Sequence, residues 1–304
     1  MGELHKLGAD LLTGFQPGES LSFAHESLEQ LQARAQRMLE IGLHGLGFSA
    51  YVAGQSPKYY SELTEAQIRW RLKTMAHHTR WIRTFSCGMG NGIAPRVAKE
   101  FGLKTMVGAW IDGDEEKDAE EIEAVIEIAQ AGHADLIAVG NEVLLRGDME
   151  QAQLIELIQS VQERVDVPVG YVDAYFLFVN RPELVEVCDF LPLNCYPFWE
   201  GIALERAVPY AQEMVRRVQG VSGGKPVMIA ETGWPTAGRS EREAMPSLRN
   251  MLLYLLNIAL WTDDEELPLF WFSAFDEAWK IGPEGDCGAF WGLWDAEGES
   301  KLAP

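Results

Sequence analysis

Short apolar runs recur along the chain, and each is bounded by polar or turn-forming residues. Continuous runs of this length are typical of strands buried on both faces of a parallel sheet. The eight candidate strands are 45–51, 80–85, 103–110, 135–141, 167–174, 188–195, 225–231 and 267–274. Between them, apolar residues spaced three and four apart predict helices. These are expected at 64–77, 116–132, 149–165, 204–219 and 241–262, with weaker helices at 92–101 and 182–187.

The alternation of strand and helix predicts a mostly parallel sheet. Eight such units favour a single closed (β/α)8 TIM barrel over an open doubly wound sheet. The first strand runs into Tyr51-Val52-Ala53-Gly54-Gln55, which lacks the glycine-rich turn of a dinucleotide-binding fold. Residues 1–304 are therefore expected to form one domain, in which residues 1–22 are an N-terminal extension.

The two ends of the barrel pattern are irregular. Residues 275–304, after the last strand, are rich in glycine and aromatic residues and show no helical period, whereas an additional helix is expected at 27–41, before the first strand. We infer that this N-terminal helix fills the place of the last barrel helix, between the eighth strand and the first.

The charge of the chain narrows the range of partners. With 46 acidic and 25 basic residues its formal net charge is −21, which disfavours nucleic acid and anionic membranes as partners. The longest apolar stretch, 251–261, is too short to span a bilayer. The first 15 residues lack the unbroken apolar core of a signal peptide, so we expect a cytoplasmic protein as written, or a periplasmic or secreted one if the N-terminus was trimmed.

Two glutamates lie at the carboxyl ends of predicted strands. Glu142 comes after the fourth apolar run and Glu231 after the seventh. In such a barrel the active site lies at the carboxyl ends of the strands, so the two side chains should face one site. Glycoside hydrolysis requires such a pair, one carboxyl as the acid and the other as nucleophile or base. The acid must have a pKa above the usual value near 4.3, raised by burial or by the other carboxylate.

The residues around both glutamates resemble glycoside hydrolase family 17. The segments are Leu136–Val143 (LIAVGNEV) and Ala230–Gly238 (AETGWPTAG). The resemblance implies a retaining, two-step double-displacement enzyme that acts on β-1,3-linked glucan, with Glu142 as acid/base and Glu231 as nucleophile. It implies no cofactor and no metal ion. A metal-dependent hydrolase is not expected, because the sequence places no cluster of histidine or aspartate residues at the strand ends.

The resemblance extends to further substrate-binding residues. Asn141 would bind the sugar 2-hydroxyl, and Tyr196, in the motif that begins at Asn194, would orient Glu231. In the segment Phe275–Lys280, Glu277 and Lys280 would bind sugar hydroxyls. Less specific matches are Tyr51 and Arg83. Aromatic residues near strand ends are expected to pack against sugar rings, and they are Trp110, Tyr175, Phe198, Trp199 and Trp234.

Several alternatives remain open. The loops after the second and fifth strands differ from those of plant endo-glucanases and look closer to bacterial members, among which transglycosylases occur. The same two carboxylates would serve a β-1,3-glucan transglycosylase, because only the acceptor differs. A catalytically silent carbohydrate-binding protein is a third possibility, although such a protein would have no reason to keep the complete residue set. Endo or exo action and the oligomeric state are not predicted.

Overall fold

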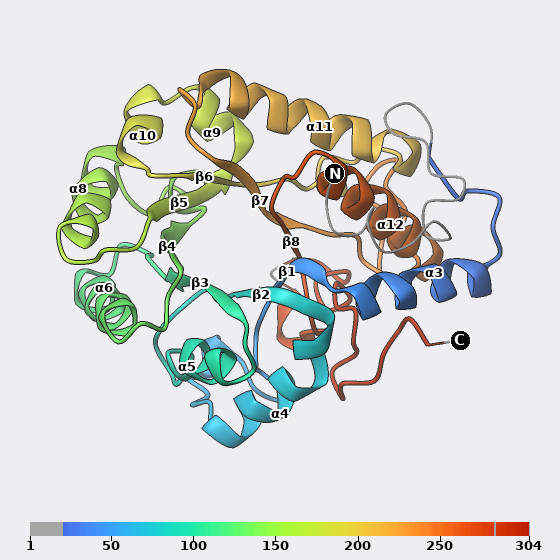
Figure 1. The fold of residues 1–304 in the computed structure, drawn as a ribbon, viewed down its shortest axis with the longest axis horizontal. Helices are drawn as coiled ribbons and strands as arrows, with labels where there is room; N and C mark the ends of the chain where they lie inside the picture. The colour runs from blue at the N-terminus through green and yellow to red at the C-terminus, as the bar shows by residue number, and fades with distance from the viewer. Residues whose placement is uncertain (1–20, 283, 304) are drawn as a thin grey trace.

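The computed structural model describes residues 21–282 and 284–303, and its eight strands close into one parallel barrel (Figure 1). Neighbouring strands pair in chain order, and β8 pairs with β1 to complete the ring. The strands are β1 (Leu43–Gly47), β2 (Thr79–Arg83), β3 (Lys104–Ala109), β4 (Leu136–Asn141), β5 (Val169–Ala174), β6 (Leu191–Asn194), β7 (Val227–Thr232) and β8 (Leu269–Trp271). This confirms the predicted (β/α)8 TIM barrel. Nearly all of the predicted N-terminal extension, 1–22, lies outside the described residues.

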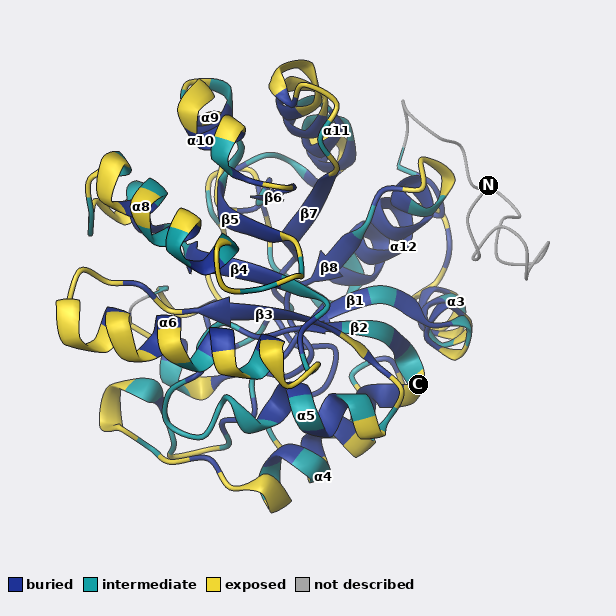
Figure 2. Ribbon diagram, turned by 60° about the vertical axis from the view of Figure 1, so that its left-hand side comes forward, coloured by how far each residue is buried: buried dark blue, intermediate teal, exposed yellow. Residues whose placement is uncertain are grey.

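Helices cover the outside of the barrel, and Figure 2 shows their buried faces turned toward the strands. They are α3 (Leu28–Ile41), α4 (Glu65–Met75), α5 (Ile93–Glu100), α6 (Glu115–Gln130), α7 (Val143–Arg146), α8 (Gln151–Gln162), α9 (Tyr175–Val179), α10 (Pro182–Val187), α11 (Leu204–Val221) and α12 (Leu248–Asp264). Three short 3-10 helices complete the set: η1 (Pro57–Tyr59), η2 (Ala76–His78) and η3 (Ala278–Lys280).

Several element boundaries differ from the sequence prediction, and two short helices were not predicted. The first strand ends at Gly47, so the segment up to Tyr51 is a loop. The helix expected at 241–262 begins only at Leu248, where the Ser247 side chain accepts a hydrogen bond from the backbone N–H of Asn250. Helices α7 and α9 have only four and five residues, too few to show a helical period in the sequence.

The N-terminal helix α3 occupies the expected place. It begins at a capping box formed by Ser27 and Gln30, and it packs against α12 and η2 beside β1 (Figures 1 and 2). Its fully buried side chains include Leu31 and Met38. Among the described residues after β8, η3 is the one helical segment. The inference that α3 replaces the last barrel helix is therefore confirmed.

Apolar side chains fill the interior of the barrel, as is usual for this fold. A cluster separate from the strand–helix core consists of Met106, Ala138, Val172, Phe190, Met228, Ala230 and Phe270. Gly45 leaves room for the Phe270 ring, because a Cβ at that position would lie 2.4 Å from it. The buried charged and amide side chains of Arg83, Asn194 and Glu231 lie instead at the carboxyl ends of the strands. The carboxyl ends of these strands therefore carry a buried polar site.

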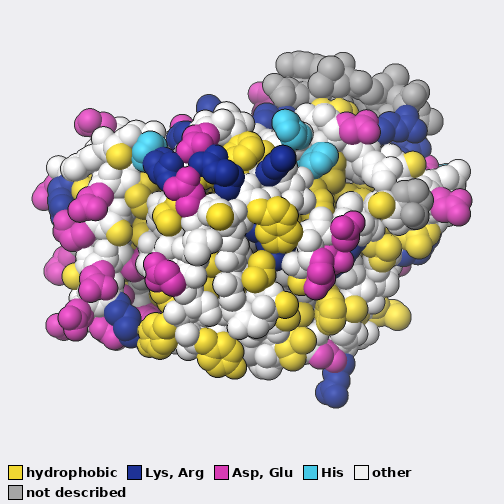
Figure 3. Space-filling view, turned by 90° about the horizontal axis from the view of Figure 1, so that it is seen from below, with side chains coloured by type: hydrophobic (Ala, Val, Ile, Leu, Met, Phe, Trp, Pro, Cys, Tyr) yellow, Lys and Arg dark blue, Asp and Glu magenta, His cyan; other side chains and the backbone are white. Residues whose placement is uncertain are grey.

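The acidic excess lies on the surface. In Figure 3 acidic side chains crowd the left-hand end, the end that α6 covers in Figure 1, and α6 carries exposed Glu116, Glu120, Glu123 and Glu127. No helix in the described part of the chain has both the length and the apolar character needed to cross a membrane.

The place of α3 predicts a loss of stability when its buried face is truncated. Leu31→Ala should lower the free energy of unfolding by about 2–5 kcal/mol, because the leucine is fully buried. Leu28→Ala, on the same helix but 40% exposed, should change it by less than about 0.5 kcal/mol. Urea unfolding followed by circular dichroism measures both. Equal values for the two variants would mean that α3 is not part of the barrel core.

Candidate active site

Glu142 lies at the junction of β4 and α7. Its backbone N–H donates to the carbonyl of Val172 on β5 at 2.8 Å, and its φ of 56° is in the left-handed region. This conformation is uncommon for a residue other than glycine and is found most often at functional sites. The turn breaks the strand direction at Glu142 and begins α7 at Val143.

Glu231 is the penultimate residue of β7 and is 6% exposed. Its Oε1 forms an ion pair with Arg83 of β2 at 2.5 Å, and its Oε2 accepts a hydrogen bond from the Tyr196 hydroxyl at 2.6 Å. Both carboxylate oxygens of Glu231 are therefore bound by protein groups. Burial raises the pKa of Tyr196 well above its usual value, and the neighbouring Glu231 carboxylate raises it further. The tyrosine therefore keeps its proton.

A chain of hydrogen bonds joins the two glutamates. The Arg83 guanidinium also donates to Asn141 Oδ1 at 2.8 Å. Asn194 of β6 donates to the same Oδ1 at 3.4 Å and to Glu142 Oε1 at 2.8 Å. The carboxyl ends of β2, β4, β6 and β7 therefore meet in one network, as the strand-end positions predicted.

The two carboxyls have opposite surroundings. The pKa of Glu142 is raised to about 7, chiefly by burial and next by the negative charge of Glu231, whereas the hydrogen bond from Asn194 opposes the shift. Arg146 lowers this pKa slightly and Asp173 raises it. Glu231, in contrast, is bound to a guanidinium and a phenol. Glu142 is therefore set to hold a proton near neutral pH, while both oxygens of Glu231 are bound by cationic or hydroxyl groups.

A second polar group lies on the loop after β8. Lys280 contacts Glu277 Oε2 at 3.0 Å, and Trp279 Nε1 donates to Glu277 Oε1 at 3.0 Å. The Lys280 ammonium lies 4.0 Å from the centre of the Phe272 ring. Burial lowers the pKa of Lys280, but Glu277 and Glu284 beside it outweigh burial and raise it. The lysine therefore stays charged although it is buried.

Tyr51 borders this group. Its ring packs edge-to-face against Trp279 at 6.4 Å, and its hydroxyl accepts a hydrogen bond from Asn91 at 3.1 Å. Glu277 is among the charges that raise the pKa of Tyr51, although burial raises it most. The predicted residues Tyr51, Glu277 and Lys280 are therefore close to one another at the end of β8 and the loop after β1.

The predicted aromatic platforms separate into two groups. Trp110 and Trp199 are each 36% exposed, and their rings lie near Arg146 and Trp291 respectively. Phe198 and Trp234, in contrast, are completely buried and pack on each other. Their prediction as sugar platforms is therefore corrected, since neither ring presents a free face.

Tyr175 is not brought to the network either. It is the first residue of α9, its ring contacts Phe176, and its hydroxyl bonds to Tyr210 on α11. The short helix α9, which the sequence did not reveal, turns this tyrosine toward the outer helices.

Sequence reasoning missed the buried pair Tyr171 and Asp173 on β5 and also Arg146 on α7. The Asp173 carboxylate accepts hydrogen bonds from the Leu145 N–H at 3.3 Å and from the Tyr171 hydroxyl. Arg146 donates to the carbonyl oxygens of Asn141 and Ile111. Asp173 did carry a signal, because it is a carboxylate at the end of an apolar strand, as Glu142 and Glu231 are.

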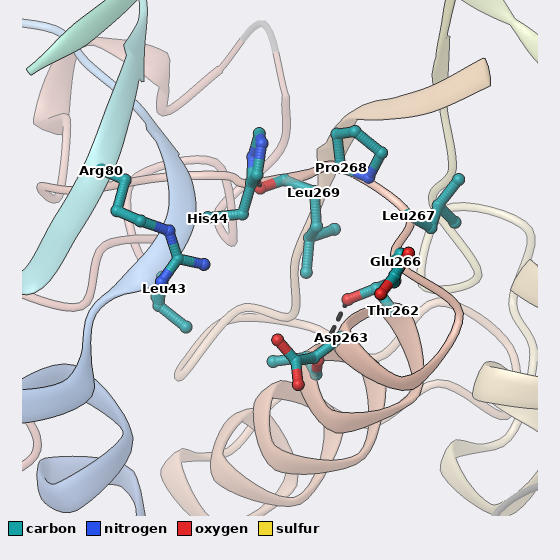
Figure 4. Close-up of a pocket in the computed structure, with 10 residues that line it drawn as sticks. Leu43, His44, Arg80, Thr262, Asp263, Glu266, Leu267, Pro268 and Leu269 are labelled. Carbon is teal, nitrogen blue, oxygen red and sulfur yellow. Dashed lines mark hydrogen bonds between the residues drawn. The ribbon is translucent and has the colours of Figure 1, made fainter. Parts of the chain in front are cut away.

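A pocket of about 220 Å³ lies at the opposite end of the barrel (Figure 4). It is lined by the amino ends of β1 and β8 and the end of α12, including His44, Arg80, Asp263 and Glu266. Burial lowers the pKa of His44 to about 4, so this imidazole is neutral at physiological pH. Barrel enzymes act at the carboxyl ends of their strands, so this pocket is separate from the candidate site.

A closed parallel barrel with two glutamates joined by hydrogen bonds at the ends of β4 and β7 is typical of the (β/α)8 glycoside hydrolases. Residues 45–292 match the BtgE/BtgC glycoside hydrolase domain. The chain therefore belongs to this family, within glycoside hydrolase family 17.

Similar proteins are fungal. A glucan 1,3-beta-glucosidase of Schizosaccharomyces pombe is 29% identical over 228 residues, which are 68% of this chain and 71% of that protein. One of Arthroderma benhamiae is 29% identical over 265 residues, 78% of this chain and 84% of that protein. The crystal structure of a family 17 beta-1,3-glucanosyltransferase from Rhizomucor miehei has a TM-score of 0.77 at 28% identity, covering 85% of this chain and 95% of that chain. An active-site mutant of that enzyme has been solved with laminaritriose.

The electrostatics of the site predict how Glu142 titrates. In Glu231→Gln the neighbouring negative charge is gone, so the pKa of Glu142 should fall below about 7 while burial keeps it above the usual carboxyl range. Carbon-13 NMR of labelled glutamate carboxyls measures this, with Glu142→Gln to assign the resonance. Glu277→Gln serves as the control and should leave the titration in place. An unchanged pKa in Glu231→Gln would show that the two carboxyls do not interact.

Proposed function

We propose that this protein cleaves β-1,3-linked glucan with retention of configuration, with Glu142 as acid/base and Glu231 as nucleophile. The observation that carries the proposal is the contrast between the two carboxyls. Glu231 accepts from Arg83 and Tyr196, an arrangement suited to a carboxylate nucleophile, whereas the pKa of Glu142 is raised to about 7. A retaining glycosidase needs this division of protonation states before the first step.

In the first step Glu231 would attack the anomeric carbon while Glu142 gives its proton to the leaving oxygen. The carboxylate forms an ester with the sugar, and the glycosidic bond breaks. Positive charge develops on the ring in the transition state. The ion pair with Arg83 and the Tyr196 hydrogen bond hold Glu231 in one orientation for this attack.

In the second step Glu142 would act as base. Once Glu231 is esterified its negative charge is gone, and with it one of the causes that raise the pKa of Glu142. Glu142 can then take a proton from water or from a sugar hydroxyl, whose oxygen attacks the anomeric carbon and releases Glu231. The same pair therefore serves both steps without rearrangement of the backbone.

The remaining polar residues would bind the sugar. Asn141 Oδ1 already accepts from Arg83 and Asn194, which leaves the Asn141 amide nitrogen to donate to the 2-hydroxyl. Glu277 and Lys280 would bind further hydroxyls, with Tyr51 beside them. The names of the relatives, glucan 1,3-beta-glucosidases and a beta-1,3-glucanosyltransferase, support β-1,3-linked glucose units as the substrate.

Transfer to a second sugar is the alternative outcome of the second step. Trp199 is partly exposed, and its ring centre lies 5.3 Å from that of the buried Trp291. The exposed part of the Trp199 ring would give an acceptor sugar a surface to pack on. The similarity to a beta-1,3-glucanosyltransferase also favours transfer. Water and sugar would compete for the same ester.

We further propose that the protein acts outside the cytoplasm as one catalytic domain, because a β-glucan polymer is too large to reach an enzyme behind a membrane. The proposed partner is the β-glucan substrate, and neither nucleic acid nor a membrane is proposed as a partner. No cofactor and no metal ion are proposed for the reaction. A closer relation to bacterial members of the family stays a prediction, since the relatives described above are fungal.

Removal of either carboxyl tests the assignment. Glu231→Ala and Glu142→Ala should each lower turnover of a β-1,3-gluco-oligosaccharide by about 100-fold or more, the scale expected for loss of acid–base or nucleophilic catalysis. Glu156→Ala, at an exposed position of α8, is the matched control and should be fully active. Mass spectrometry of the products also distinguishes the two reactions: hydrolysis gives only shorter oligosaccharides, whereas transfer also gives longer ones. Near-normal turnover in either active-site variant would exclude the assigned role.

The pKa of Glu142 predicts the pH dependence. Because the acid must be protonated in the free enzyme, kcat/KM for an oligosaccharide should fall as the pH rises through about 7. An activated aryl glycoside needs no proton on its leaving group, so its kcat/KM should lack this limb. A descending limb of equal size for both substrates would assign it to another group.

A further inference from the structure

Two buried side chains of β5 bond to the turn that carries Glu142. Tyr171 and Asp173 point to the same side of the strand, and both are completely buried. The Tyr171 hydroxyl donates to Asp173 Oδ2. Asp173 Oδ1 accepts from the N–H of Ala174 at 2.7 Å, so its other oxygen is left for the tyrosine and for α7.

The bonds from this pair go to the first residues of α7. The Leu144 N–H donates to the Tyr171 hydroxyl at 2.9 Å, and the Leu145 N–H donates to Asp173 Oδ2 at 3.3 Å. N–H groups in the first turn of a helix have no partner within it, so the pair supplies acceptors that the chain otherwise lacks. The helix begins directly after Glu142.

The backbone of Glu142 needs such support. Its φ of 56° costs about 1–2 kcal/mol for a residue with a side chain, so the neighbouring structure must hold it. On the other side of the turn, Arg146 donates to the carbonyl of Asn141, and its Nε lies 2.6 Å from Asp148. The β5 pair and Arg146 therefore hold the turn from two sides.

We propose that Tyr171 and Asp173 are positioning residues, which hold the backbone of Glu142 so that its carboxyl meets the leaving oxygen. This inference rests on the proposed role of Glu142 as acid/base. Neither side chain would touch the substrate, because both are buried beneath the turn.

The pair also acts through charge. The groups that act on the Glu142 carboxyl are Glu231 and Asp173, which raise its pKa, and Asn194 and Arg146, which lower it. Burial raises the pKa of Asp173 itself, while the Tyr171 hydroxyl and the two N–H groups oppose that shift. Removal of the charge and removal of the hydrogen bond should therefore have different effects.

Tyr171→Phe tests the positioning. The Leu144 N–H loses its acceptor and Asp173 loses a donor, while the carboxylate remains. We expect kcat/KM for an oligosaccharide to fall by about 10- to 100-fold, the scale of a misplaced acid, and kcat/KM for an activated aryl glycoside to stay at the wild-type value. The control is Tyr210→Phe, a tyrosine on the outer helix α11. Equal losses on both substrates would overturn the proposal, because a merely structural defect does not distinguish between leaving groups.

Asp173→Asn tests the effect of the Asp173 charge on Glu142, and its result can be measured without an activity assay. We expect the Glu142 carboxyl to titrate at lower pH in this variant than in the wild type, as followed by carbon-13 NMR. Asp189→Asn is the control, since Asp189 accepts from Val169 at the opposite end of β5. An unchanged titration would overturn the role of Asp173 even if Tyr171→Phe failed to fold. Full activity of Glu142→Gln would instead overturn the proposed function, so the two failures are distinguishable.

Discussion

The buried ion pair between Arg83 and Glu231 is the interaction on which the site depends. A guanidinium that is 1% exposed bears a large desolvation cost, and two of its nitrogens recover part of it from Glu231 and Asn141. A pair of this kind contributes little net stability, but it tolerates only one arrangement of its partners. It therefore fixes the ends of β2, β4 and β7 relative to one another, and with them the two glutamates.

Around this ion pair, one fold creates two kinds of carboxyl. Glu231 lies within a strand and receives both donors directly, whereas Glu142 directly follows its strand and receives an amide hydrogen bond from Asn194. The negative charge held by Arg83 then acts on Glu142 and favours its protonated form. The two side chains are chemically identical, so the difference between them comes from their surroundings: chiefly burial and the charge of Glu231 for Glu142, and the bonds to Arg83 and Tyr196 for Glu231.

The barrel and the two glutamates could be predicted from the sequence. The features that could not be predicted depend on contacts between segments far apart in the chain or on helices too short to show a period. Eight apolar runs predicted the barrel because strands buried on both faces are continuous in sequence, and the glutamates at their ends were found for the same reason. The burial of Phe198 and Trp234 was not predictable, because it depends on how loops after different strands pack on each other. Helices α7 and α9 are too short for a periodic signal, and α9 turns Tyr175 away from the site. Asp173 had the right position but lacked a surrounding motif, so its bonds to α7 appear only in three dimensions.

The hydrogen-bonded residues at the strand ends and the partly exposed tryptophans outside them would have different effects on hydrolysis and transfer. Every residue in the hydrogen-bonded chain from Glu231 to Glu142 lies on a strand or directly after one, and a change at any of them alters both reactions alike. Trp110 and Trp199 lie outside that chain and are partly exposed. Substitutions at such positions can change which acceptor binds without any change in the protonation of the pair. In the proposed mechanism, the hydrogen-bonded network would therefore supply the chemistry common to both reactions, and residues such as Trp110 and Trp199 would determine whether water or a sugar completes the second step.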